Sequence, residues 1–218
     1  MKDIPVTRGR RLITSLVAEG EHVRQDFKYT ISDARKIARS ISAFANAEGG
    51  RLLIGVKDNG VIAGVRNEED VYVVELAGSR YCDPPQQIDF HAYSIDTGVT
   101  VIVAGIAKAD SRPVRCQEPD GRWNAYYRVA DENILAHPLM VRSWMNRDGL
   151  AFSLNAESSA LLDLLSRHPE GLDTRDIAVA LQMSHRRAAD LITGLAAAGV
   201  VTFTYLSPSF RITLPKEE

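Results

Sequence analysis

Three carboxylate residues near the start of the chain are spaced so that they can hold a divalent metal ion. Glu21 and Asp26 lie in a segment that alternates like a strand, and Asp58 follows a short apolar strand. Carboxylates on neighbouring strands supply the oxygen ligands that Mg²⁺ and Mn²⁺ prefer, and such a metal activates water. In a second interpretation Arg24 and Lys28 pair with the first two carboxylates on the surface, and Asp58 serves only a tight turn. Taken alone, the residues favour the second interpretation.

Basic residues are concentrated at the front of the chain, where they can contact phosphate. The formal net charge is only −2, but residues 1–40 hold nine Lys and Arg against five Asp and Glu. Residues 153–218 hold six Lys and Arg against eight Asp and Glu. Because phosphate contacts supply most of non-specific DNA binding, this composition argues against strong non-specific affinity in that part of the chain. The candidate phosphate contacts at the front are Arg24, Lys28, Arg35, Lys36 and Arg39.

A pair of glycines, Gly49 and Gly50, follows a predicted helix and has two interpretations. The glycines can let a phosphate approach the backbone closely, with Asn46 facing the ligand. Alternatively they end the helix and open a strand, and Asn46 caps the helix end; for Asn46 capping is the favoured interpretation. No glycine in the chain is followed by Lys, so a Walker-type phosphate loop is excluded.

The predicted helices and strands that position these residues follow one pattern in residues 1–150 and another in residues 151–218. In residues 1–150, helical periodicity alternates with strands predicted at 51–56, 61–65, 88–95, 100–107 and 123–129. Thr30 is the expected N-cap of the long helix before Gly49, with Asp33 completing a capping box. No apolar run reaches the roughly 18 residues that a membrane span needs. Cys82 and Cys116 are expected to be free thiols.

Residues 151–218 predict three helices followed by a two-stranded hairpin, which is the order of a winged helix-turn-helix. The third helix is capped by Ser184 and stopped by Gly199. In such folds the start of this helix enters the major groove, where Arg suits guanine edges or phosphates. The candidate contacts are Ser184, His185, Arg186 and Arg187. The alternative is a docking or dimerisation module whose arginines only face solvent.

The front of the chain resembles the Schlafen-type AlbA-like domain over about residues 15–135. The specific stretches are 21–28, the Ala-Phe-Ala-Asn-Ala-Glu-Gly-Gly run at 43–50, the Ile-Gly-Val-Lys-Asp run at 54–58, and residues 112–114 and 126–129. The resemblance implies nucleic-acid binding, because bacterial members that add a C-terminal winged helix are described as DNA-binding transcriptional regulators. Some animal relatives are metal-dependent ribonucleases. By position their catalytic acids correspond to Glu21, Asp26 and Asp58, although Asp26 stands where Glu is usual.

The sequence therefore predicts an α+β protein, with a mixed-sheet AlbA-like domain at 1–150 and a winged helix-turn-helix at 151–218. The favoured function is a cytoplasmic, homodimeric DNA-binding transcriptional regulator that needs no cofactor. The first alternative is a nuclease that uses Mg²⁺ or Mn²⁺ on RNA or single-stranded DNA. The second is a protein-docking module.

Overall fold

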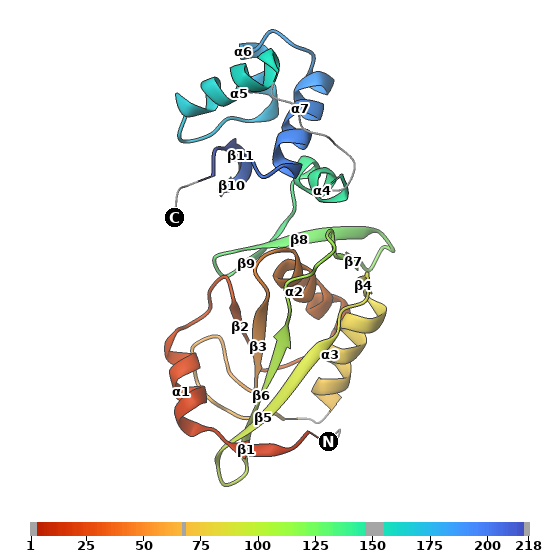
Figure 1. Ribbon diagram of the computed structural model, residues 1–218. Coiled ribbons are helices and arrows are strands. Elements are labelled where there is room, and N and C mark those ends of the chain that lie inside the picture. The colour runs from red at the N-terminus through yellow and green to blue at the C-terminus, as the bar shows by residue number, and fades with distance from the viewer. Residues whose placement is uncertain (1–3, 67–68, 147–154, 216–218) are drawn as a thin grey trace. The chain divides into compact units, whose positions relative to one another are not determined.

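The computed structural model describes residues 4–66, 69–146 and 155–215, and the chain divides into two compact units, Met1–Leu135 and Ala136–Glu218 (Figure 1). The fold is mixed α+β. The domain boundary predicted between residues 150 and 151 lies outside the described residues. In the part of the chain that is described, no helix combines the length and apolar character needed to cross a bilayer.

A mixed five-stranded sheet forms the centre of the first unit. β6 pairs antiparallel with β5 and β3, whereas β1 is parallel to β5 and β2 is parallel to β3. The apolar stretch predicted at 100–107 therefore becomes the central strand. In sheet order the strands are β1 (Val6–Arg8), β5 (Ile88–Asp96), β6 (Val99–Ile106), β3 (Gly50–Ile54) and β2 (Gln25–Lys28).

Helices cover both faces of this sheet, which explains why its inner strands are apolar on both sides (Figure 1). α2 and α3 pack on the face that carries Leu52 and Ile102. α1 packs on the opposite face, against Leu53 and Val101. Successive residues of a strand point to opposite faces, so each strand contributes to both cores. The three helices are α1 (Arg10–Ala18), α2 (Ala34–Asn46) and α3 (Glu69–Arg80).

A second, antiparallel sheet covers the other side of α2, and nine of the 13 residues of this helix are buried. Cys82 and Cys116 are opposite each other where β4 pairs with β7, and both are free and buried, as the sequence predicts. The strands lie in the order β4 (Cys82–Asp83), β7 (Arg115–Gln117), β8 (Trp123–Val129) and β9 (Glu132–Leu135).

Two local predictions for the first unit are wrong. The N-cap of α2 is Asp33 and not Thr30, because the Asp33 carboxylate accepts the backbone N–H of Arg35 at 2.9 Å. The returning strand predicted at 61–65 is reduced to an isolated bridge between Val56 and Ile62. The turn between them does form, since the Gly60 N–H donates to the carbonyl of Lys57 at 2.8 Å.

The described residues of the second unit form four helices and a two-stranded hairpin. Asn155, Asp173 and Ser184 each cap a helix by accepting a backbone N–H three residues on. The cap at Ser184 is the one predicted above from the sequence. The elements are α4 (Pro138–Met145), α5 (Ala156–Ser166), α6 (Thr174–Ala180), α7 (His185–Ala197), β10 (Thr202–Leu206) and β11 (Ser209–Thr213).

Candidate functional site

Two of the three predicted acidic residues lie together at β2. Asp26 is within the strand and only 5% exposed, while the Oε1 atom of Glu21 accepts the backbone N–H of Phe27 at 2.8 Å. Burial raises the pKa of Glu21, and the neighbouring Asp26 carboxyl raises it further, against the opposing effect of the Phe27 N–H. The carboxyl groups of Glu21 and Asp26 are therefore neighbours at β2.

Cations hold both oxygens of Asp26. Lys28 places its Nζ atom 2.6 Å from Oδ2, and Arg128 places Nη2 3.4 Å from Oδ1. The Arg128 side chain is 1% exposed, and it also donates to the Gln25 carbonyl at 3.1 Å and to Asn133 Oδ1 at 2.9 Å. A buried carboxylate needs such partners because an unpaired charge in the interior is costly. Asp26 is thus a structural partner of Arg128 in this arrangement.

The third acidic residue, Asp58, lies apart in an exposed turn beyond β3. Among the described residues, no group of three or more His, Cys, Asp and Glu side chains gathers as a metal site requires. The donor atoms of Asp26 already face Lys28 and Arg128, which repel a divalent cation. The residues present therefore do not fit a metal ion held by Glu21, Asp26 and Asp58.

Most of the basic residues predicted to contact phosphate in the first unit have protein partners. Arg39 forms a forked ion pair with Glu118, and Lys28 pairs with Asp26. Arg35 lies over the ring of Tyr81, 4.6 Å from its centroid. The remaining two, Arg24 and Lys36, are exposed, and Arg24 donates to the Glu48 carbonyl at 3.1 Å. These five cations therefore do not form one free basic surface.

The Arg39–Glu118 pair belongs to a network between α2 and the second sheet. Tyr126 donates its hydroxyl to Glu118 Oε1 at 2.7 Å. Burial and the Glu118 carboxylate raise the pKa of Tyr126 to about 12. Burial alone would raise the pKa of Glu118, but hydrogen bonds from Arg39 and Tyr126 leave it below its ordinary value. The Tyr126 side chain thus contributes to the packing around α2.

Asn46, Gly49 and Gly50 are held inside the first unit. Asn46 is fully buried, and its side chain accepts the Val114 N–H at 2.8 Å and donates to the Val114 and Tyr126 carbonyls at 2.8 and 2.9 Å. A Cβ at Gly49 would lie 2.9 Å from the Ile106 carbonyl oxygen, and one at Gly50 would lie 2.3 Å from the Phe44 ring. Packing and backbone geometry therefore account for all three residues, whose predicted approach to phosphate stays a prediction.

The start of α7 presents its four predicted residues to solvent. Ser184 caps the helix by accepting the Arg187 N–H at 3.2 Å, and Arg187 forms an ion pair with Glu157 at 2.7 Å. His185 and Arg186 are exposed. The opposite face of the helix is buried through Ala188, Ile192 and Leu195. A helix anchored in this way holds its first turn outward at a fixed angle.

Arg128 is the residue at this site whose role the sequence did not reveal. It stands in the Tyr126–Val129 stretch used for the resemblance, yet its pairing with Asp26 joins residues about a hundred positions apart. The available signal was an arginine inside a predicted strand, because an Arg that such a strand buries needs a partner.

Comparison with known proteins places residues 21–137 in the family model described as Schlafen, AlbA_2. No curated protein matches the sequence. Two solved structures are similar at low identity: the DIP2311 protein from Corynebacterium diphtheriae, and the N-terminal domain of a RecG-related protein from Nitrosomonas europaea. The first is 15% identical with a TM-score of 0.43 over 92% of this chain, which spans 38% of that protein's chain. The second is 17% identical with a TM-score of 0.43, over 68% of this chain and 95% of the other.

Proposed function

The chain belongs to the Schlafen, AlbA_2 family, and from that membership and the exposed start of α7 we propose that it is a DNA-binding transcriptional regulator. In this proposal the second unit is a winged helix-turn-helix. Its order of helices α5, α6 and α7 followed by the β10–β11 hairpin supports this assignment.

The observation that carries the proposal is the outward first turn of α7. Arg186 is exposed, while Arg187 is shared with Glu157 and has to give up that partner to reach a base or phosphate. Arg186 is therefore the sharper probe of DNA contact. An arginine fork that binds guanine or phosphate contributes charge-assisted hydrogen bonds that no uncharged side chain replaces.

The test compares Arg186→Ala with Arg167→Ala in a mobility-shift titration of the full chain on duplex DNA. Arg167 is an exposed arginine at the end of α5, so the two variants lose the same charge from the same unit. We expect Arg186→Ala to weaken binding about tenfold and Arg167→Ala to weaken it less than twofold. Equal affinities of the two variants for the duplex would contradict the proposed DNA contact by α7.

We further propose that the protein acts as a homodimer, because one such unit buries little DNA surface and paired half-sites raise specificity. The same titration measures this. Two chains per bound duplex support the dimer, and one chain per duplex at saturation contradicts it.

The carboxyl pair of Glu21 and Asp26 supports one alternative, a nuclease acting on RNA or single-stranded DNA. This alternative is tested by incubating the full chain with transfer RNA and single-stranded DNA in the presence of Mn²⁺. Cleavage that is lost in Asp26→Asn, while circular dichroism shows the variant still folded, would establish the alternative. Because Lys28 and Arg128 occupy the surroundings of Asp26, we expect no such cleavage.

A further inference from the structure

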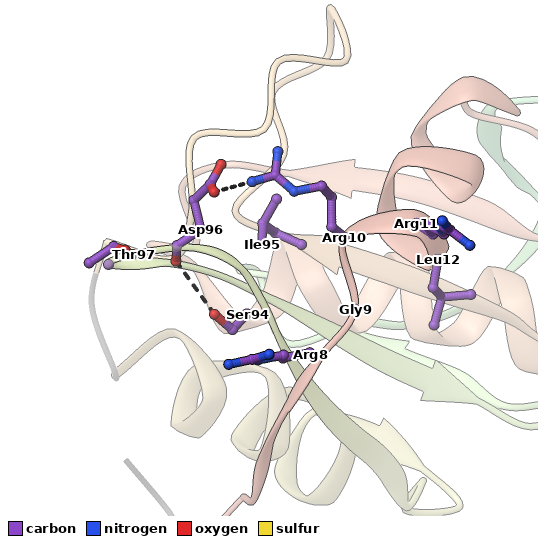
Figure 2. Close-up of a pocket in the computed structure, with 10 residues that line it drawn as sticks. Arg8, Gly9, Arg10, Arg11, Leu12, Ser94, Ile95, Asp96 and Thr97 are labelled. Carbon is purple, nitrogen blue, oxygen red and sulfur yellow. Dashed lines mark hydrogen bonds and ion pairs between the residues drawn. The ribbon is translucent and has the colours of Figure 1, made fainter.

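A surface cavity of about 640 Å³ lies at the edge of the first unit, between the start of α1 and the turn that joins β5 to β6 (Figure 2). Three arginines, Arg8, Arg10 and Arg11, line one side of it. The other side is formed by the end of β5 and the turn that follows it, residues 94–98. None of these arginines was among the predicted phosphate contacts.

Strand pairing holds the arginines in place. β1 runs parallel to β5, so that Arg8 is the register partner of Ser94, and the Gly9 N–H donates to the Ser94 carbonyl at 3.1 Å. A Cβ at Gly9 would lie 2.4 Å from Tyr93 Cδ1, so glycine lets the chain turn closely over β5 into α1. The Arg-Gly-Arg-Arg sequence therefore brings Arg10 to the β5–β6 turn, while Arg8 and Arg11 line the cavity on the same side as Arg10.

The cavity carries an excess of positive charge. Arg10 pairs with Asp96, and Figure 2 shows this pair reaching across from the helix start to the turn. Within the described part of the chain, Arg8 and Arg11 have no carboxylate partner. Asp96 is the one acidic residue in the lining, and Ser94 and Thr97 add hydroxyl groups. The cavity thus has three guanidinium forks, one internal counter-ion and two neutral hydrogen-bonding side chains.

From this arrangement we infer that the cavity binds phosphate groups of a nucleic-acid backbone. Guanidinium forks match the oxygens of a phosphodiester, and hydroxyl groups complete its hydrogen bonding. The cations predicted for this role elsewhere, such as Lys28 and Arg39, are already paired with Asp26 and Glu118. The inference rests on the proposed DNA-binding function and assigns its non-specific phosphate contacts to the first unit.

Asp96 sets the strength of this site because it competes with phosphate for Arg10. Both side chains are more than half exposed, so a phosphate group can displace the carboxylate without unfolding the turn. Removing the Asp96 charge leaves the arginine free. Asp96→Asn is therefore expected to tighten nucleic-acid binding, an effect that a merely structural ion pair would not produce.

The test measures fluorescence anisotropy of a labelled random duplex with the full chain at 50–200 mM salt. The double variant Arg8→Gln/Arg11→Gln is compared with Arg80→Gln/Arg122→Gln, which removes two exposed arginines elsewhere in the same unit. Two lost phosphate contacts predict about tenfold weaker binding near 0.1 M salt and a salt slope smaller by about 1.8. The control pair keeps the wild-type slope, and Asp96→Asn binds several-fold more tightly.

Three outcomes separate the claims. Duplex binding whose affinity and salt slope are equal in the cavity variant and its control overturns the cavity and leaves the DNA-binding function standing. No duplex binding by the wild-type chain overturns both. Loss of binding on adding micromolar inorganic phosphate at constant ionic strength assigns the cavity to free phosphate and overturns the backbone site. Thr97→Glu adds a negative charge at the exposed turn and must also weaken duplex binding. This variant replaces Arg8→Gln/Arg11→Gln in the test if the double variant does not fold.

Discussion

At the scale of single residues, the buried pair of Asp26 and Arg128 decides how the acidic site is interpreted. Both side chains are less than a tenth exposed, and Arg128 also lies over the Phe44 ring, 4.8 Å from its centroid. The guanidinium joins β8 to β2 through Asp26 and the Gln25 carbonyl. The pair therefore stabilises the contact between the second sheet and the first.

We predict that Asp26→Asn lowers the free energy of unfolding by about 3 kcal/mol, because removing one partner leaves a buried charge uncompensated. The control is Asp89→Asn, at an exposed aspartate on β5 whose carboxylate forms an ion pair with His91. Urea denaturation of both variants measures the difference. A change below about 0.5 kcal/mol for Asp26→Asn would mean that Arg128 is satisfied without it.

At the scale of elements, the glycine pair after α2 sets how the helix passes into the central sheet. Gly49 has a φ of +70° and its N–H donates to the Phe44 carbonyl at 2.9 Å, which closes the end of the helix. The backbone of Ile106 and Lys108 then lies against the position of a missing Cβ. The glycines are thus required by close backbone packing at this junction.

Gly49→Ala is expected to destabilise the protein more than Gly121→Ala, which separates packing from backbone strain. Both glycines have positive φ, but nothing lies within 4 Å of a Cβ at Gly121. The strain at either site costs about 1 kcal/mol, and the clash at Gly49 adds roughly 1–3 kcal/mol. Thermal unfolding followed by circular dichroism measures both. Equal losses would show that the junction can relax around an extra methyl group.

The helices and strands could be predicted from residues close together in the sequence. The contacts between residues far apart in the sequence could not. The apolar run of β6 and the cap Ser184 are visible in the sequence because each depends on neighbours a few residues away. Thr30 was a wrong cap because Asp33, three residues later, offers a stronger acceptor at the actual start of α2.

The pairing of charges was not predictable in the same way. A periodic pattern shows that Arg39 lies on a helix, but its partner Glu118 is 79 positions away and is brought close only by the second sheet. The same holds for Arg128 with Asp26. In the sequence the five cations at the front of the chain suggest a basic surface, whereas folding pairs several of them. Among the described residues, Arg8 and Arg11 beside the cavity have no carboxylate partner.

At the scale of the whole molecule, we propose that the two units contribute different parts of DNA recognition. The C-terminal part from residue 153 is slightly acidic, so α7 can select a sequence but supplies little of the non-specific attraction. The cavity of the first unit adds guanidinium groups for the backbone.

The central claim, that this chain binds nucleic acid through several arginine–phosphate contacts, is tested most directly by the salt dependence of duplex binding. Fluorescence anisotropy of the unmodified chain on a labelled random duplex gives the observed affinity between 50 and 200 mM salt. Contacts from Arg8, Arg11 and Arg186 alone predict that log K falls against log salt with a slope of about −2.7 or steeper. A slope near zero, or no binding at 50 mM salt, would contradict the account.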